Sequence, residues 1–240
     1  RNGLVSFGGF ILNSGKSLLP VSIGRKRKIE FIGDSFVAGL GSEGKTRDCV
    51  FNRDNENSYI AFGPVLARRL NADYSIIAVS GIGIIRNFGD TTFTSPKTLP
   101  HYFERTCFNE DLKWDFKKWQ PDLVVVRLGN NDYWHKPYPV TSEFENAYIN
   151  FLKQIRKFYP NTSMLVLCEP VRKDPHCDFI KNVVAEFKSK LKDKKIWYKE
   201  LDVNLDKTKD YGCQEHPNES GHKKIADALE PIVRRAMGWR

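Results

Sequence analysis

The strongest constraint on the fold is a repeated alternation between short apolar segments and longer amphipathic ones. Continuous apolar runs are typical of parallel strands that are covered on both faces, and helical periodicity between such runs is typical of βαβ units. The predicted strands are 28–32, 74–79, 123–128, 164–167 and 195–198, and the predicted helices are 58–70, 144–159, 179–191 and 221–237. This pattern predicts a three-layer α/β/α fold around a central, mostly parallel five-stranded sheet of the flavodoxin-like type.

Residues 1–24 differ in character from the rest of the chain. The apolar runs 4–7 and 10–12 predict short strands, and Gly8-Gly9 and residues 13–15 predict tight turns, with a basic run following at 25–28. We therefore expect 1–24 to be a β-rich segment or linker and 25–240 to be one domain. The sequence begins at Arg1, so any signal peptide or preceding module would have been removed or not cloned, and the absence of a signal indicates little about the compartment.

Composition limits the class of protein. A chain of 240 residues with 40% hydrophobic residues can bury a full core, and no apolar run approaches the roughly 18 residues of a membrane helix. The formal charge of +9 comes mostly from clusters of basic residues, which we interpret as solvated helix faces. The alternative is attraction to an anionic polymer, but no nucleic-acid-binding motif supports it.

Five cysteines are present, and none of them has the CxxC spacing that is typical of a zinc site. Cys168 ends an apolar run, so we expect a buried thiol there. The other four lie in loop-like or helix-start sequence, namely Cys49, Cys107, Cys177 and Cys213. Together with glycosylation sequons at Asn161 and Asn218, they favour a secreted glycoprotein.

Two motifs that could support catalysis follow predicted strands. Gly33-Asp34-Ser35 places a serine hydroxyl at the end of the first strand, in a sequence unlike the G-x-S-x-G elbow. Ser80-Gly81 follows the second strand, where the Gly81 N–H can point at a developing oxyanion. Each motif alone is equally consistent with an ordinary turn.

Two further motifs complete the set. Asn131 lies in a Gly-Asn-Asn-Asp turn after the third strand, and its side-chain amide is a possible second oxyanion donor. His216-Pro217-Asn218 precedes the last helix and offers an imidazole base that works near neutral pH.

The blocks GDS, SG, GxND and HPN, in this order, resemble the SGNH (GDSL) hydrolase family. The Ser, Gly, Asn and His of that family name correspond to Ser35, Gly81, Asn131 and His216, and the resemblance covers 28–238. The stretches IEFIGDS, SGIGIIRNFGD, WDFKKWQPDLVVVRLGNNDY and YGCQEHPNESGHKKIADAL are similar to carbohydrate esterase family two. Members of that family remove acetyl groups from plant polysaccharides such as xylan and glucomannan, often at a primary hydroxyl. They also carry an N-terminal β-sandwich, and residues 1–20 resemble the last part of that sandwich.

The resemblance implies a mechanism for the domain 25–240. Ser35 would be the nucleophile and His216 its base, while the N–H groups of Ser35 and Gly81 and the Asn131 amide would bind the oxyanion. No metal or other cofactor is implied. The expected substrate is an acetylated carbohydrate, and neither a nucleic acid nor a membrane is an expected partner. We expect the protein to be a monomer.

One departure from the family pattern concerns the acid that usually lies three residues before the histidine. That position is Cys213, so we expect a dyad in which a backbone carbonyl orients His216, as in some family-two esterases. Asp210 or Glu215 remains an alternative orienting acid.

The cysteines are expected to form two disulfides. Similar pairs in eukaryotic relatives, and the expected approach of the loops, imply Cys49–Cys107 and Cys177–Cys213, with Cys168 free.

Residues near the motifs bear on the substrate. The aromatic side chains at 133, 134 and 138 and the polar groups around them favour sugar stacking over the broad apolar mouth of a lipase. The candidate substrate-binding residues are Arg86, Asn87, Asp132 and Trp134. The alternatives are an esterase or lipase that acts on other small acyl esters and a non-catalytic carbohydrate-binding protein, although the latter would be expected to lack a catalytic residue.

Overall fold

The computed structural model describes residues 7–20, 24–169 and 175–240. Five parallel strands form one sheet in the order β2-β1-β3-β4-β5. The strands are β1 (Arg27–Gly33), β2 (Ala72–Ala78), β3 (Leu123–Arg127), β4 (Ser163–Cys168) and β5 (Ile196–Glu200). The predicted sheet is therefore confirmed, with all its pairings parallel.

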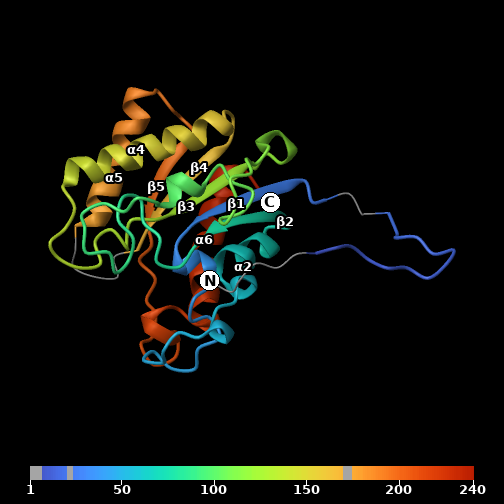
Figure 1. Cartoon of the computed structure of the whole chain (residues 1–240). Helices are drawn as coiled ribbons and strands as arrows, with labels where there is room; N and C mark the ends of the chain where they lie inside the picture. The colour runs from blue at the N-terminus through green and yellow to red at the C-terminus, as the bar shows by residue number, and fades with distance from the viewer. Residues whose placement is uncertain (1–6, 21–23, 170–174) are drawn as a thin grey trace.

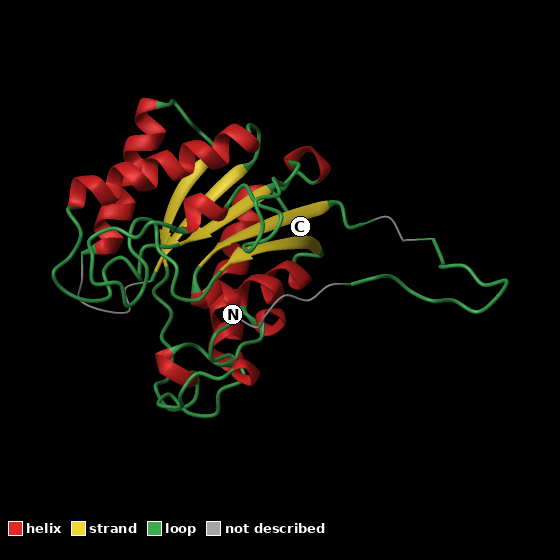
Figure 2. Ribbon diagram, viewed as in Figure 1, coloured by secondary structure: helices red, strands yellow, loops and turns green. Residues whose placement is uncertain are grey.

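Helices cover both faces of this sheet, as Figures 1 and 2 show. The α-helices are α1 (Ser35–Ala38), α2 (Phe62–Arg69), α3 (Leu99–Tyr102), α4 (Thr141–Phe158), α5 (His176–Lys190) and α6 (Glu219–Met237). Short 3₁₀ turns are η1 (Arg53–Asn55), η2 (Ser58–Ile60), η3 (Phe116–Lys118) and η4 (Cys213–Glu215). Helices α4 and α5 lie on one face and α2 and α6 on the other, which gives the three predicted layers.

Strand β3 shows why both faces are apolar. Val124 and Val126 pack in the core formed with α4 and α5, whereas Leu123 and Val125 pack in the core formed with α2 and α6. Successive side chains of a strand point to opposite faces, so a strand covered on both sides needs a continuous apolar run.

Helix α2 begins later than the periodicity predicted. Ser58–Ile60 forms a 3₁₀ turn, and Ala61 is extended before the helix starts at Phe62. Pro64 explains the boundary, because its missing N–H costs nothing in the first turn of a helix. A helix starting at Ser58 would have placed Pro64 in its interior.

Residues 7–20 form an irregular arm that extends from the α/β body in Figure 1. The strand expected around Phe10 and Ile11 does not form, and these side chains are 68% and 104% exposed. An isolated extended segment has no neighbour to satisfy its backbone groups, which is why it does not form a ladder. The other expected strand, near Leu4, lies largely outside the described residues, and the division at residue 24 stays a prediction.

The disulfides differ from those expected. Cys49 pairs with Cys213 and Cys168 pairs with Cys177, while Cys107 is free and partly buried. The predicted pairs Cys49–Cys107 and Cys177–Cys213, and the free thiol at Cys168, were therefore wrong. Cys168 ends β4 and Cys177 lies in the first turn of α5, so a nine-residue separation brings them together.

The sheet also brings the predicted motifs together. Gly33 at the end of β1 pairs with Ala78 at the end of β2 and with Arg127 at the end of β3. The loops that follow these three strands therefore leave the sheet side by side at its carboxyl edge, where ligands bind in open α/β sheets.

Within the described residues, no helix has both the length and the apolar composition that a bilayer crossing requires.

Candidate active site

Ser35 lies at the start of α1, one residue after Asp34, which follows the end of β1. The Asp34 side chain caps the helix by accepting a hydrogen bond from the N–H of Phe36 at 3.1 Å. A Cβ atom on Gly33 would lie 2.4 Å from Val37 Cγ2 and 2.6 Å from the Arg127 carbonyl oxygen. The turn that presents Ser35 therefore has room only for glycine at this position.

A buried ion pair between Asp34 and Arg127 stabilises this turn. Arg127 Nη1 lies 2.7 Å from both carboxylate oxygens of Asp34, and both side chains are under 5% exposed. The Arg127 guanidinium also lies 3.8 Å from the centre of the Phe36 ring. Because a buried charge is stable only with its partner, the pair fixes the end of β1 against the end of β3.

His216 reaches Ser35 from the loop before α6. Its Nε2 lies 2.7 Å from Ser35 Oγ, and its Nδ1 lies 2.7 Å from the backbone carbonyl oxygen of Gln214. A carbonyl oxygen only accepts hydrogen bonds, so Nδ1 carries the hydrogen and Nε2 is left to accept a proton from the serine hydroxyl. This is the geometry of a nucleophile with its general base.

Burial lowers the pKa of His216 below its ordinary value of 6.5, and the hydrogen bond to the Gln214 carbonyl offsets part of that effect. The Asp34 carboxylate also raises the pKa, and Arg127 lowers it. The imidazole is therefore predominantly neutral at pH 7, which is the form that a base requires.

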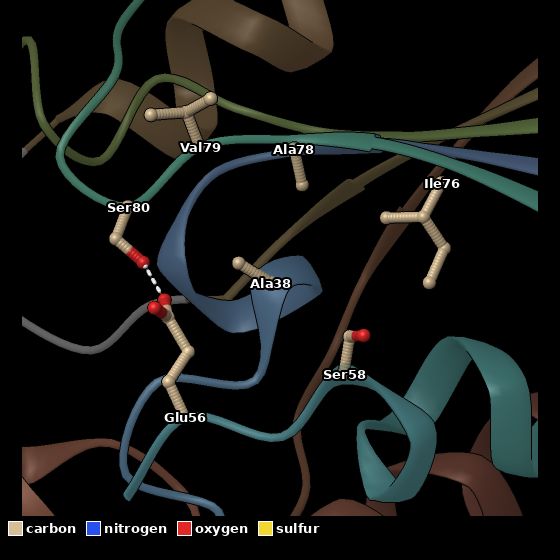
Figure 3. A pocket seen from close by; sticks show the side chains of 7 residues that line it. All are labelled: Ala38, Glu56, Ser58, Ile76, Ala78, Val79 and Ser80. Carbon is tan, nitrogen blue, oxygen red and sulfur yellow. Dashed lines mark hydrogen bonds between the residues drawn. The ribbon is translucent and has the colours of Figure 1, made fainter. Parts of the chain in front are cut away.

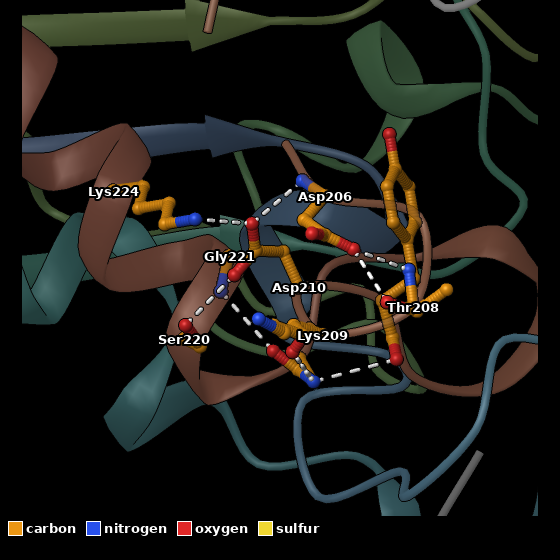
Figure 4. Close-up of polar contacts among 9 residues, drawn as sticks. Asp206, Thr208, Lys209, Asp210, Ser220, Gly221 and Lys224 are labelled. Carbon is orange, nitrogen blue, oxygen red and sulfur yellow. Dashed lines mark hydrogen bonds and ion pairs between the residues drawn. The ribbon is translucent and has the colours of Figure 1, made fainter. Parts of the chain in front are cut away.

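The two candidate orienting acids are engaged elsewhere. Asp210 accepts hydrogen bonds from the Asp206 N–H and from the Ser220 hydroxyl, and it pairs with Lys224 near the start of α6 (Figure 4). Glu215 pairs with Arg47 at 2.8 Å. The imidazole Nδ1 instead meets a backbone carbonyl, which is the arrangement expected for a dyad.

The candidate oxyanion donors face the same cavity. Gly81 follows β2 with a φ of 84°, and Asn131 follows β3. Asn131 Nδ2 donates one hydrogen to the Ile82 carbonyl oxygen at 2.7 Å. A side-chain amide carries two hydrogens on this nitrogen, so a second one is available for a ligand while the first fixes the orientation.

Asp132 and Arg86 are not placed to bind a substrate, contrary to expectation. Asp132 is fully buried and accepts the N–H groups of Ile84, Ile85 and Arg86 at 2.7–3.1 Å. The Arg86 guanidinium, also buried, donates to the carbonyl oxygens of Asp132, His135 and Pro137. Burial raises the pKa of Asp132 to about 6, against the lowering effect of these N–H donors. The two residues hold the loop after β2 against the loop after β3.

Asn87 has a similar structural role. Its side-chain oxygen accepts the Gly83 N–H at 3.1 Å, and its Nδ2 donates to the Lys97 carbonyl oxygen at 3.0 Å. These bonds stabilise the loop after β2 and leave one Nδ2 hydrogen of Asn87 without a bond to any described residue, so a contact with a sugar stays a prediction.

Trp134 does line the cavity, and it is 45% exposed. It packs edge-to-face against Phe88, which is 47% exposed, with ring centres 4.9 Å apart. The cavity measures about 150 Å³. It is lined by Ser35, Phe36, Leu40, Ser80, Gly81, Phe88, Asn130, Asn131, Trp134, Gln214, Glu215 and His216.

A second cavity of about 330 Å³ meets the first at Ser80 (Figure 3). Ser80 points into it and donates a hydrogen bond to the Glu56 carboxylate, and Ser58 lies on the same side. Glu56 lies in a polar loop without any motif around it, so the sequence gives no reason to place it beside Ser80.

One group of potential metal ligands occurs among the described residues, formed by Cys168, His176 and Cys177. Its two sulfur atoms are joined in a disulfide, so they are not thiolates that could bind a metal ion.

Comparison with known families shows which family the chain belongs to. Residues 31–224 match the model of the GDSL-like Lipase/Acylhydrolase family. The chain belongs to this family. The resemblance expected from the four motifs is thus confirmed.

Two curated relatives are similar over most of this chain. It is 33% identical to the cellulase/esterase CelE of Acetivibrio thermocellus over 99% of its own length, and 30% identical to an acetylxylan esterase / glucomannan deacetylase of Cellvibrio japonicus over 89%. The chain spans only 29% and 61% of the length of these two relatives.

Solved structures agree. A family two carbohydrate esterase from Clostridium thermocellum, in complex with cellohexaose, is 31% identical with a TM-score of 0.84, covering 93% of this chain and 68% of the other. An acetyl xylan esterase from Butyrivibrio proteoclasticus is 25% identical with a TM-score of 0.79, covering 93% and 66%.

Proposed function

We propose that this protein is a serine esterase that removes acetyl groups from acetylated sugars or plant cell-wall polysaccharides such as xylan and glucomannan. The observation that carries the proposal is the contact of Ser35 Oγ with His216 Nε2 at 2.7 Å, inside a cavity that Gly81 and Asn131 also line. The relatives that deacetylate xylan or glucomannan support the choice of substrate.

The mechanism follows from the tautomer. As His216 Nε2 takes the hydroxyl proton, Ser35 Oγ attacks the acetyl carbonyl carbon. The negative charge that forms on the carbonyl oxygen is stabilised by the N–H groups of Ser35 and Gly81 and by the Asn131 amide, each typically contributing about 2.7–4 kcal/mol to lowering the barrier. The bond between the acyl carbon and the sugar oxygen then breaks, and His216 gives its proton to that oxygen, which leaves as a sugar hydroxyl.

Deacylation repeats these steps with water in place of the serine hydroxyl. His216 removes a proton from water, the resulting nucleophile attacks the acetyl-serine, and acetate leaves as Ser35 recovers its proton. The carbonyl of Gln214 keeps the imidazole in the same tautomer through both halves of the reaction.

The lining of the cavity supports a sugar ester as substrate. The half-exposed rings of Phe88 and Trp134 offer a face on which a sugar ring can stack. Two disulfides support a protein that works in an oxidising, extracellular environment. We propose that it is secreted and acts as a monomer.

The experiment is a comparison of substrates. The protein is incubated with acetylated xylan, acetylated glucomannan and p-nitrophenyl esters of two to twelve carbons, with the Ser35→Ala protein as blank. We expect acetate release from at least one polysaccharide and a kcat/KM that falls steeply beyond the acetyl ester. A preference for the long-chain esters would reject the deacetylase assignment while leaving the chemistry in place.

A further inference from the structure

The turn before His216 has an unusual backbone. Gln214 and Glu215 have φ values of 54° and 58°, so two consecutive residues with side chains lie in the left-handed region. Such residues are uncommon and cost about 1–3 kcal/mol each, so they persist only where the surroundings enforce them. This conformation directs the Gln214 carbonyl oxygen to the His216 Nδ1 that follows two residues later.

The enforcing contacts come from a segment far away in sequence. The N–H of Gln214 donates to the Cys49 carbonyl oxygen, and the N–H of Glu215 donates to the Arg47 carbonyl oxygen, both at 3.1 Å. Side chains also join residues 47–49 to residues 213–215. Cys49 forms a disulfide with Cys213, and Arg47 pairs with Glu215 at 2.8 Å.

The two segments are also packed without free space. A Cβ on Gly44 would lie 2.4 Å from the Cys213 nitrogen, and a Cβ on Gly41 would lie 2.8 Å from the Cys213 carbonyl oxygen and 3.0 Å from His216 Cβ. Within the turn, the Gly212 N–H donates to the His216 carbonyl oxygen at 2.7 Å. Movement of residues 41–49 would therefore move the carbonyl that orients the base.

We propose that residues 41–49 act as a clamp that positions His216 for catalysis, and that the Cys49–Cys213 disulfide is its essential part. This inference rests on the proposed esterase function. Cys213 occupies the place of the acid that usually orients the histidine. In this protein a covalent tether at Cys213 holds the neighbouring Gln214 carbonyl against the imidazole. Arg47 is a second positioning residue, and esterase activity requires the oxidised form of the disulfide.

The chain offers a matched control for this proposal. The second disulfide, Cys168–Cys177, ties β4 to α5 within the core that also holds Phe144 and Ile180. We compare a Cys49→Ser, Cys213→Ser variant with a Cys168→Ser, Cys177→Ser variant, using p-nitrophenyl acetate well below the melting temperature of each. For the first variant we expect kcat to fall by about 10²-fold, the loss typical of a misplacement of about 1 Å, with KM changed less than about threefold. For the second we expect kcat within about twofold of wild type.

These measurements separate positioning from stability. A disulfide that only stabilises the fold would change the melting temperature and leave kcat unchanged at a temperature where the circular dichroism spectrum is native. That result would overturn the clamp. Ser35→Ala is measured in parallel, and if it retained wild-type activity the proposed function itself would fail, whatever the disulfide variants show.

Two further measurements apply if the double variant does not fold. In the Cys168→Ser, Cys177→Ser background, dithiothreitol transfers two electrons and two protons to the remaining Cys49–Cys213 bond of the folded protein and becomes a cyclic disulfide. We expect kcat to fall on reduction and to return on reoxidation. If thiol titration shows that reduction is complete and kcat is nevertheless unchanged, the proposal is rejected.

Arg47→Ala, with the disulfide intact, should lower kcat by about three- to tenfold, and Arg47→Lys should restore most of it because the ion pair with Glu215 can re-form. Equal activity in Arg47→Ala and wild type would remove Arg47 from the clamp.

Discussion

The nucleophile and the base of this site are held in two different ways. Ser35 lies at the junction of β1 and α1, where a helix cap and the buried Asp34–Arg127 pair fix it within regular structure. His216 lies in an irregular turn between η4 and α6, where backbone contacts and the Cys49–Cys213 disulfide fix it from outside. The nucleophile is therefore held by elements of the central α/β fold, which we call the sheet-bound half, and the base is held by a loop, which we call the loop-bound half.

This difference determines how each half responds to change. The environment of Ser35 cannot be altered without disturbing the core, so changes there affect stability and activity together. The environment of His216 is peripheral, so changes there can alter turnover in a folded protein. The predictions that follow test this contrast.

The largest effect is expected at the nucleophile itself. Ser35→Ala removes the hydroxyl that forms the acyl-enzyme and should reduce ester hydrolysis to below a few per cent of wild type without unfolding the protein. The measurement is initial-rate hydrolysis of p-nitrophenyl acetate, with circular dichroism as the check on folding. Activity above that level in the folded variant would mean that another group attacks the ester.

Asn131→Ala should lower kcat by about 10²–10³-fold, the usual cost of losing one oxyanion donor. The effect on KM should be small, because the donor acts on charge that is present only in the transition state. Steady-state kinetics with one acetyl ester separate the two parameters. A loss confined to KM would instead identify Asn131 as a substrate-binding residue.

The Asp34–Arg127 pair tests the sheet-bound half. Arg127→Met leaves the buried Asp34 carboxylate without its cation, and such a change typically destabilises a protein by about 3–5 kcal/mol. The control is Arg69→Met, which breaks the surface pair with Asp227 and should cost about 0–1 kcal/mol. Urea unfolding compares the two variants, and equal stabilities would show that the buried pair does not anchor the turn of Ser35.

The sequence predicted the sheet-bound half better than the loop-bound half. The strands were visible as apolar runs, and parallel strands bring their carboxyl ends together, so Ser35, Gly81 and Asn131 could be placed at one edge. The dyad was inferred from Cys213 at the acid position, but the particular carbonyl was not, because the left-handed conformation of Gln214 depends on contacts with residues 47 and 49.

The errors share a cause. Disulfide pairing depends on where loops without periodicity lie in space, and so Cys49 was assigned to Cys107 instead of Cys213. Arg86 and Asp132 lie in sequence beside the motifs and near aromatic residues, a combination that favours sugar binding. In the structure their charges face backbone groups inside the protein, an arrangement that local sequence does not reveal.

The pH profile tests how the base is held. Because burial lowers the pKa of His216, and a neutral carbonyl offsets this effect only in part, the acid limb of kcat/KM should have its midpoint below 6.5. Activity should rise with pH through this midpoint, since the base works only when neutral. His222 cannot account for the limb, because burial lowers its pKa to about 3. A midpoint above 7 would indicate that an anion stabilises the imidazolium.

The smallest effects are expected at the two acidic residues near the histidine. Asp210 is bonded to Ser220 and Lys224, and Glu215 pairs with Arg47, while the Gln214 carbonyl contacts His216 Nδ1. Asp210→Asn and Glu215→Gln should therefore each lower kcat by less than about tenfold, whereas conversion of a triad acid to its amide costs about 10⁴-fold. Turnover of p-nitrophenyl acetate by folded variants decides between these values. A loss near 10⁴-fold in either variant would mean that an anion orients His216. The conclusion that a loop-held carbonyl positions the base would then be wrong.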